Sequence, residues 1–432
     1  MQSGPGFVTV DAVELAIAIA TLALVVALAV LRPRAVVRFT PGSAALVGVA
    51  VLLATRLLPV SEVAEAARVQ WRPLLALTCI LVMTGVVQEV GAFDRLAAIV
   101  EARARRTSIG HTFTIVFVIS VITPALLNND AAILVLTPIV VALTRRLYPG
   151  QPEVTLAFAF AVFLAPGVAP FIVSNPMNMI VAEFAGLHFN SYAAVMLPIS
   201  AVGALLTYVV LRRLSRGTFA GVVAAPAPPL TVHARPGERP AVGLMLAVFA
   251  AYPLAAALGI QIWYVAVAGA AGSLVIAACY RIAPLRKVVG HVSIDILVFL
   301  WGIFLVVRGL QHVGVVTELA ALYHVATPGS GAQLVTIGAT SALGSALIDN
   351  HPMSLLNMMA IDTTHGAKPL LAALVGGDIG PRLLPIGSLA GLLWIDLLRR
   401  AGISVGVARF ARLGTLVLLP TLAVSLALLW LL

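Results

Sequence analysis

Charged residues are scarce in this chain. Only 10% of the 432 residues are charged and 61% are hydrophobic, whereas a soluble globular chain carries about 25% charged residues. Runs such as Leu15 to Leu31 are apolar without alternation, so they need lipid or protein on every side. A transmembrane barrel strand would alternate apolar and polar residues. The composition therefore predicts an all-α polytopic membrane protein.

The sequence also lacks the motifs of several functional classes. Its two cysteines, Cys79 and Cys279, form no CxxC pair and no metal-ligand cluster, so no metal and no cofactor is expected. It contains no HExxH, GxSxG or P-loop motif. The basic residues behind the net charge of +10 lie in short loops between apolar runs, which argues against nucleic-acid binding. We therefore expect a transporter and not an enzyme.

The apolar runs predict membrane crossings, hairpins and broken helices. About 20 apolar residues cross a bilayer. Two apolar segments, about 110–146 and about 333–362, are cut in the middle by polar residues, so their arms are too short to cross and fit re-entrant hairpins. Two others, about 153–190 and about 370–398, are interrupted by Pro and Gly and are expected to be broken helices. The simple crossings are expected near 12–31, 42–60, 73–91, 191–211, 241–258, 261–280, 291–311 and 413–432.

The basic residues predict the topology. Arg103, Arg105 and Arg106 precede the first hairpin and Arg145 and Arg146 follow it, so both flanks should be cytoplasmic. Both termini then fall on the periplasmic side of a bacterial inner membrane. Of the 27 Lys and Arg residues, the only ones in predicted outside loops are Arg56, Arg68, Arg72 and Lys368.

The chain reads as two related halves, 1–211 and 241–432, joined by a basic cytoplasmic linker over 212–240. Because each half has an odd number of crossings, the second half is expected to be inverted relative to the first. Inverted repeats with interrupted helices are typical of secondary transporters, whose binding site lies at the repeat interface near the midplane. The matching stretches are Val90–Ala97 with Val313–Ala320, Ala125–Asp130 with Ala346–His351, Ser174 with Ser388, and Gly186 with Gly402.

Polar residues gather at the hairpin tips and helix breaks. A carboxylate at membrane depth is costly and marks a functional site by default, although helix packing and simple proline kinks are the alternatives. Asp378 and Arg382 are four residues apart and are expected to form an ion pair on one helix face. Proton coupling is expected from Asp130, Asp349, His351 and Asp378. Substrate binding is expected from Asn128, Asn129, Asp130, Ser174, Asn175, Asn178, Asp349, Asn350 and Ser388.

Three blocks resemble the ArsB arsenite permeases of the ion transporter superfamily. Asn129–Val140 is similar to that family's hairpin motif, and Ser174–Leu187 is similar to its next block. Gly377–Ala390 is the strongest match, with an acidic residue, Gly-Pro-basic and then Pro-Ile-Gly-Ser-Leu-Ala. One departure is the second tip, Asp349–Pro352, where the family usually has Asn-Asn-x-Pro. This departure adds an ionisable acid and a histidine.

The resemblance implies export of arsenite and antimonite driven by the proton gradient, with a soluble ATPase of the ArsA type as an optional partner. Arsenite near neutral pH is an uncharged trihydroxide, which Asn, Ser and Asp side chains can hydrogen-bond. A sodium/proton antiporter or an anion carrier of the same superfamily is the first alternative. A passive channel for neutral hydroxides is the alternative from another class.

Overall fold

The computed structural model describes residues 12–31, 39–226, 232–364 and 366–432. Throughout these ranges the regular structure is helical, with no strand. Nine of the described helices are long and apolar enough to cross a membrane. The predicted all-α polytopic class is therefore confirmed.

The first half contains long helices, then a helical hairpin, a broken helix and a further long helix. Its elements are α1 (Ala12–Leu31), α2 (Pro41–Ala54), α3 (Val60–Glu89), α4 (Ala92–Ala104), α5 (Ile109–Leu126), α6 (Asn129–Leu147), α7 (Pro152–Leu164), the 3₁₀ turn η1 (Ile172–Ser174), α8 (Pro176–Phe184), α9 (Phe189–Leu214) and the short α10 (Arg216–Phe219).

The second half repeats this order. Its elements are α11 (Glu238–Ala257), α12 (Ile262–Cys279), the short α13 (Leu285–Val289), α14 (Ile294–His312), α15 (Val315–Tyr323), α16 (Gly331–Ile348), α17 (Asn350–Ala360), α18 (Lys368–Ile379), the 3₁₀ turns η2 (Gly380–Arg382) and η3 (Pro385–Gly387), α19 (Leu389–Arg400) and α20 (Val407–Leu431).

Local backbone features recur at matching places in the two halves. Gly91 and Gly314 precede α4 and α15 with φ of +77° and +84°, a left-handed conformation that glycine adopts without steric cost. Ser108 and Ser330 cap the hairpin helices α5 and α16. The matched stretches of sequence therefore correspond to matched turns and caps.

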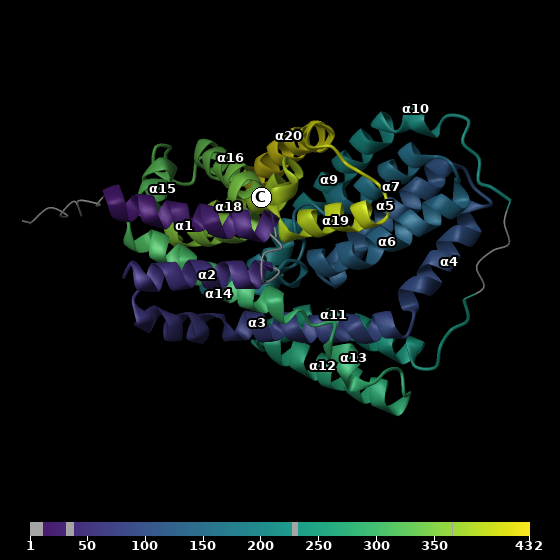
Figure 1. Ribbon diagram of the computed structural model, residues 1–432, viewed down its shortest axis with the longest axis horizontal. Helices are drawn as coiled ribbons and strands as arrows, with labels where there is room; N and C mark the ends of the chain where they lie inside the picture. Colours follow the sequence, from purple (N-terminus) through teal and green to yellow (C-terminus); the bar gives the residue numbers. More distant parts are fainter. Residues whose placement is uncertain (1–11, 32–38, 227–231, 365) are drawn as a thin grey trace, which may run out of the picture.

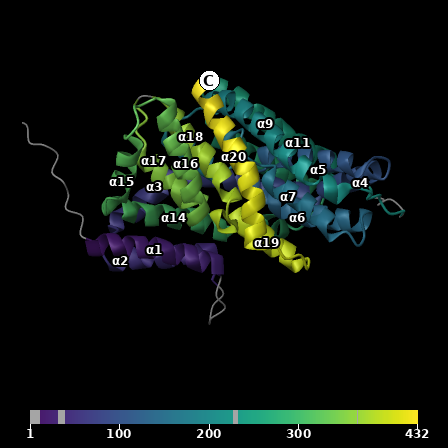
Figure 2. The same ribbon diagram turned by 90° about the horizontal axis from the view of Figure 1, so that it is seen from above.

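Helices of one half pack against helices of the other half in a reciprocal pattern. Helix α2 packs against α14, while α12, the counterpart of α2, packs against α3, the counterpart of α14. In Figures 1 and 2 the hairpin α5–α6 lies toward one end of the long axis and α16–α17 toward the other. An inverted repeat requires this arrangement, and the inversion itself stays a prediction.

Some boundaries differ from those predicted. The hairpin arms α5 and α16 are each 18 residues long and are among the nine helices long enough to cross a membrane, so the prediction that these arms are too short to cross is wrong. Helix α3 begins at Val60, well before the predicted start at residue 73, and it contains Pro73. Residues 60–72 are rich in Ala, Glu and Arg, which favour helix in water as well as at a membrane surface. Part of the predicted linker, 227–231, lies outside the described residues. On either side of it, α9 extends to Leu214 and α11 begins at Glu238.

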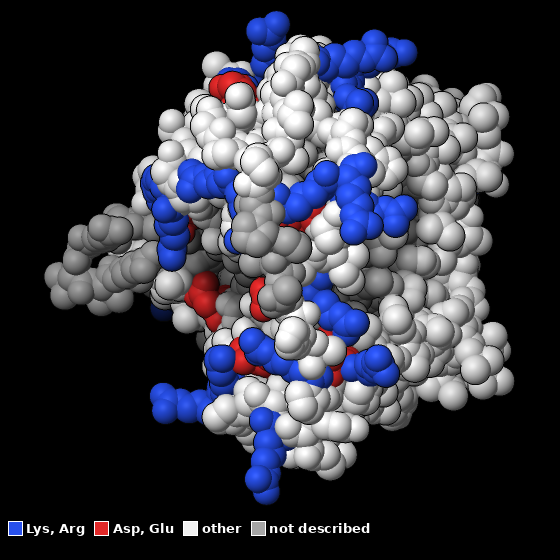
Figure 3. All heavy atoms as spheres, turned by 90° about the vertical axis from the view of Figure 1, so that its right-hand side faces the viewer, with Lys and Arg blue, Asp and Glu red and all other residues white. Residues whose placement is uncertain are grey.

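One end of the molecule is strongly basic. Figure 3 shows this end, on which the side chains of Lys and Arg are prominent. Exposed arginines lie near the ends of α4, α6 and α9, on both flanks of the hairpin α5–α6 and at the start of the linker. This end has the character of a cytoplasmic face, and the orientation of the termini stays a prediction.

Candidate functional site

Each hairpin turns at a residue with positive φ. The φ and ψ angles are +148° and +167° at Asn128 and +77° and +148° at Asp349, outside the left-handed α region and close to a strained region that is populated almost only by glycine. The Asn128 Oδ1 atom accepts a hydrogen bond from the Ala131 N–H at 2.9 Å. The Asp349 Oδ1 atom accepts from the His351 N–H at 2.9 Å and contacts His351 Nδ1 at 2.6 Å. Each tip residue therefore caps the helix that follows it.

The ionisable residues of the two tips lie within electrostatic range of one another. Asp130, in the first turn of α6, interacts with both Asp349 and His351. All three side chains are buried. The His351 ring also packs edge-on against Phe299 of α14, with ring centroids 5.4 Å apart. The two tips, 221 residues apart in sequence, thus form one buried titratable cluster.

A cavity of about 90 Å³ opens beside the first tip. Asn128 and Asp130 line one side of it. Polar side chains from α3 and from the segment that leads into α14 line the other side, namely Thr84, Gln88, His291 and Ser293. A smaller cavity of about 20 Å³ is lined by Asn129, Ser174, Asn175 and Ser200. The first tip therefore has polar space on two sides.

The residue that follows each helix break caps the helix that comes next. The Asn175 Oδ1 atom accepts from the Met177 N–H at 3.0 Å and caps α8. The Ser388 Oγ atom accepts from the Gly391 N–H at 3.0 Å and caps α19. Ser174 Oγ donates to the Ala125 carbonyl at 3.0 Å, which ties the first break to the hairpin arm α5.

Asp378 is the point at which the two broken helices join. Its Oδ2 atom accepts hydrogen bonds from the Ala169 N–H at 2.8 Å and from Asn178 Nδ2 at 3.2 Å, and its Oδ1 atom accepts from Asn175 Nδ2 at 2.7 Å. The three donors belong to the first half and the carboxylate to the second. Hydrogen bonds to an ionised acceptor are stronger than neutral ones, so these three bonds stabilise the contact between the halves. We call Asp378 and its hydrogen-bond partners the Asp378 node.

Tyr192 completes the node and was not predicted from the sequence. Its hydroxyl donates to the Ala169 carbonyl at 2.9 Å and accepts from Asn178 Nδ2 at 2.7 Å. A tyrosine at the start of an apolar run suggests an interfacial anchor. The only sequence signal for a buried role was therefore its position after the polar break, and that signal is weak.

Asp378 and Arg382 form no direct ion pair in the described structure, although their charges interact at longer range. Helix α18 ends at Ile379 and the next three residues form the 3₁₀ turn η2, so the two side chains do not share a helix face. Among the described residues, buried Arg382 donates to the carbonyls of Leu164 at 2.7 Å and Pro166 at 3.2 Å and to Thr421 Oγ1 at 3.1 Å. Its charge therefore satisfies the C-terminal carbonyls of α7.

Several acceptors at the site are buried and unpaired within the described part of the chain. They are the side-chain carbonyl oxygens of Asn129, Asn178 and Asn350. Buried polar atoms are usually paired with protein or with another molecule. Each of the three lies at a tip or at the first break, so all three are free to accept a hydrogen bond there.

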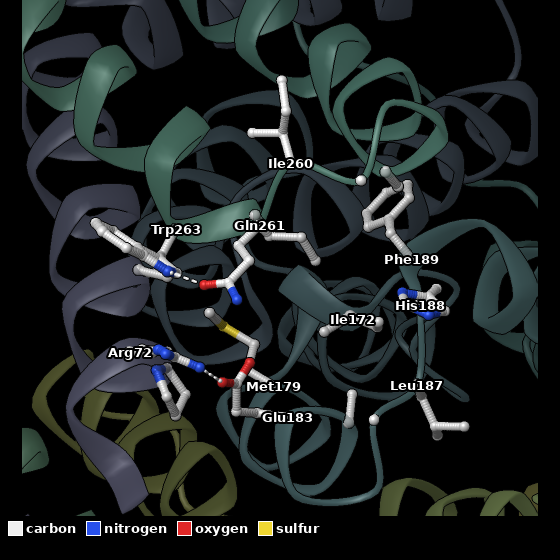
Figure 4. Close-up of a pocket in the computed structure, with 17 residues that line it drawn as sticks. Arg72, Ile172, Met179, Glu183, Leu187, His188, Phe189, Ile260, Gln261 and Trp263 are labelled. Atoms are coloured by element: carbon white, nitrogen blue, oxygen red, sulfur yellow. Dashed lines mark hydrogen bonds and ion pairs between the residues drawn. The ribbon is translucent and has the colours of Figure 1, made fainter. Parts of the chain in front are cut away.

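A larger cavity of about 320 Å³ adjoins the first break (Figure 4). Ile172 of η1 and Met179 of α8 line it, as do Arg72 of α3 and Trp263 of α12. Figure 4 shows Arg72 and Glu183 turned toward each other, and the Arg72 Nη1 atom lies 3.0 Å from the Glu183 carboxylate. This ion pair bridges α3 and α8, the helix that also carries Asn178.

Metal chemistry finds no support in the described ranges. No group of three or more His, Cys, Asp or Glu side chains there is placed to hold a metal ion. The site consists of carboxylates, carboxamides, hydroxyls and the imidazoles of His291 and His351, a donor and acceptor set suited to a small polar solute.

Comparisons with known proteins agree with one another. The family model of the arsenical pump membrane protein matches residues 15–432. An arsenical pump membrane protein of Escherichia coli K12 is 29% identical over an alignment of 401 residues that covers 89% of this chain and 92% of that protein. One of Yersinia enterocolitica is 30% identical over an alignment of 419 residues that covers 94% of this chain and 96% of that protein.

A solved structure shares the fold. The YdaH transporter of Alcanivorax borkumensis, described as having an unusual topology, aligns with a TM-score of 0.55. The alignment covers 97% of each chain at 16% sequence identity. This likeness concerns the fold alone.

Proposed function

The chain belongs to the family of arsenical pump membrane proteins, and on that premise we propose that it exports arsenite and antimonite from the cytoplasm. Transport is secondary and active: protons enter in exchange for the exported solute, by alternating access at the interface of the two halves. A soluble ATPase of the ArsA type is an optional partner in this proposal. The site residues are the polar residues of the two tips and the two breaks.

The observation that carries this proposal is the joining of the two breaks at Asp378. A carboxylate of one half accepts three hydrogen bonds from the other half. Such a group senses both the proton and the relative position of the halves, as a coupling residue must. In secondary transporters with inverted repeats, the binding site lies at this kind of interface.

The chemistry of the site suits a neutral trihydroxide. Arsenite carries three O–H donors, and Asn129, Asn178 and Asn350 each present an unpaired buried acceptor. The cavity of about 90 Å³ that is large enough for a solute of a few heavy atoms is lined by Asn128 and Asp130 and by none of these three residues, of which Asn129 lines the cavity of about 20 Å³. The absence of charge on the solute explains why the pocket needs no arginine cluster.

Protonation of Asp378 would weaken the bonds that join the halves. A neutral carboxylic acid accepts hydrogen bonds less strongly than a carboxylate, and one of its oxygens becomes a donor. The N–H of Ala169 and the amides of Asn175 and Asn178 would then be released in part. Proton binding would thereby favour the movement of one broken helix against the other.

The cavity in Figure 4 is the proposed exit. It shares α8 with the hydrogen bonds around Asp378, and by the predicted topology it faces the periplasm. The Arg72–Glu183 ion pair crosses it between α3 and α8. A shift of α8 against α3 would separate these two side chains and widen the path.

The proposal is tested by arsenite uptake into everted membrane vesicles that contain the protein, in sodium-free buffer, with and without a protonophore. Uptake against the gradient that collapses with the protonophore is the expected result. Vesicles with folded protein and a proton gradient that take up no arsenite would overturn the proposal. Uptake that requires sodium would favour the sodium-coupled alternative, and uptake that only equilibrates would favour the channel.

A further inference from the structure

A stripe of polar side chains runs through the second hairpin. Ser341 and Ser345 are four residues apart on α16, and Asn350, Ser354 and Asn357 follow one another at intervals of four and three on α17. Such spacing places each set on one face of its helix. Together with Tyr323, at the end of α15, these five residues form what we call the polar stripe. All six side chains are buried.

Hydrogen bonds connect one end of the polar stripe. The Tyr323 hydroxyl donates to Asn357 Oδ1 at 2.5 Å, and Asn357 Nδ2 donates to Ser341 Oγ at 2.9 Å. Ser341 Oγ in turn donates to the Ala373 carbonyl of α18 at 2.6 Å. The exposed residues 324–325 follow Tyr323 directly. This end of the polar stripe therefore lies one residue away from the molecular surface.

At the other end, three hydroxyls converge on Gly377. A Cβ atom at this position would lie 3.2 Å from Ser354 Oγ, 3.6 Å from Ser341 Oγ and 3.8 Å from Ser345 Oγ. Within the described structure, Ser345 Oγ and Asn350 Oδ1 are buried without a hydrogen-bond partner. Ordered water commonly binds such groups. The next residue after Gly377 is Asp378.

The first hairpin keeps polar residues only at the counterparts of Ser341 and Asn350, which are Ser120 and Asn129. The tips align at an offset of 221 residues, which matches Ser345, Ser354 and Asn357 with Pro124, Ile133 and Leu136. Ser120, the counterpart of Ser341, donates to the Val116 carbonyl of its own helix at 2.8 Å. A hairpin of this kind therefore packs well with apolar residues at these positions, and packing does not explain the polar stripe.

We propose that the polar stripe conducts the coupling proton between the end of α15 and the buried acids at the tip. Figure 2 shows α15, α16 and α17 together at one end of the molecule. By the predicted topology this end is periplasmic, the side from which protons enter. This inference rests on the proposed function, because it names the route of the proton in proton-coupled export.

The transfer conserves protons at each step. A hydroxyl or water in the polar stripe accepts one proton from its neighbour on the α15 side and releases another toward the tip. Because Asn357 and Asn350 are amides, this route uses ordered water to bridge Tyr323 to Ser341 and Ser345 to the tip. Ser341, Ser345, Ser354 and water can do this because each both donates and accepts. Asn357 does not relay a proton itself, and it positions Tyr323 and Ser341.

The test compares proton-driven arsenite uptake with arsenite exchange in everted vesicles. Exchange is measured with arsenite on both sides and a protonophore present, so it needs substrate binding and movement but no proton current. Ser345→Ala is the decisive variant, because it removes a hydroxyl without a partner and so leaves no donor or acceptor unpaired. Gly377→Ala is a second variant, which places a methyl group among the three hydroxyls.

Ser425→Ala is the matched control. Its hydroxyl is also buried and unpaired in the described chain, but it lies on α20 and faces Gly203 of α9. We expect proton-driven uptake by Ser345→Ala to fall at least about tenfold, the rate change that corresponds to about 1.4 kcal/mol on a barrier. Exchange should stay within about twofold of wild type, and the control should keep both activities within the same limit.

Three results would overturn the proton route. Unchanged proton-driven uptake in Ser345→Ala would show that the hydroxyl carries no proton. An equal loss of exchange and of driven uptake would show a structural role. Sodium-dependent uptake that is lost in Ser345→Ala would assign the hydroxyls to a cation. Failure of the proposed function is distinguishable, because it would appear in wild-type vesicles as uptake without sensitivity to the protonophore.

Discussion

Replacing Asp378 by asparagine tests the centre of the site. The carboxylate accepts from Asn175 Nδ2 through Oδ1, and from Asn178 Nδ2 and the Ala169 N–H through Oδ2. An asparagine offers one acceptor oxygen and one NH₂ group in their place. If its oxygen takes the position of Oδ2, its NH₂ group meets the NH₂ group of Asn175.

Asn175 cannot resolve this conflict by rotating its amide. Its Oδ1 atom accepts from the Met177 N–H and caps α8, so a flip would break the cap. One charge-assisted hydrogen bond is therefore lost and two donors face each other. The loss of such a bond destabilises a protein by about 1.5–3 kcal/mol. The fold keeps its other contacts at this node, so the variant should remain folded but less stable.

The effect on transport should be larger than the effect on folding. An amide cannot release or bind a proton at neutral pH, so proton-driven arsenite uptake should fall to the level of vesicles without the protein. The denaturation midpoint of the purified variant should fall as well. Asp396→Asn is the matched control, because Asp396 pairs with Arg399 and Arg400, whose side chains are largely exposed. Such pairs contribute about 0–1 kcal/mol.

Wild-type uptake by Asp378→Asn, still sensitive to the protonophore, would refute the role of Asp378 in coupling. A wild-type denaturation midpoint would refute the three-bond geometry. If Asp396→Asn lost transport to the same degree, the loss in Asp378→Asn would not be specific to Asp378 and its three hydrogen bonds.

Two further substitutions test the structural roles of Arg382 and Asn128. Arg382→Gln removes a buried charge that satisfies the carbonyls of Leu164 and Pro166. We expect about 1–3 kcal/mol of destabilisation for each buried carbonyl left without a donor, seen as a lower denaturation midpoint and a smaller folded fraction on size exclusion. Normal yield and stability would contradict this role. Asn128 needs both its side chain and its positive φ, so Asn128→Ala should lower the denaturation midpoint by the cap loss of about 1 kcal/mol plus backbone strain, whereas Asn128→Gly should lower it less. Equal midpoints for these two variants would count against the strain at the tip.

Much of the fold could be predicted from the sequence, because the composition and length of a segment govern whether it inserts into a membrane. Long apolar runs predicted most of the crossings, and Pro, Gly and polar interruptions marked the hairpins and breaks. The helical segment before Pro73 was missed, because it is too polar to count as a crossing and yet favours helix.

The sequence also marked the polar residues of the site, since an acid or amide within an apolar run stands out. It could not show which of them meet. Asp378 and Arg382 are close in sequence, but the 3₁₀ turn between them sends one side chain to Asn175 and the other to the carbonyls that end α7. Spacing along an assumed helix cannot predict where that helix unwinds.

The sequence by itself determined that the chain is a helical membrane protein with paired interruptions, because hydrophobicity and helix breakers act locally. The tertiary structure decided which groups face one another across the halves. Asp378 gained its three donors from residues about 200 positions away, and Tyr192 entered the node from an apolar run. Such contacts depend on how the helices pack, and side-chain packing is a property of the whole assembly and not of any one segment.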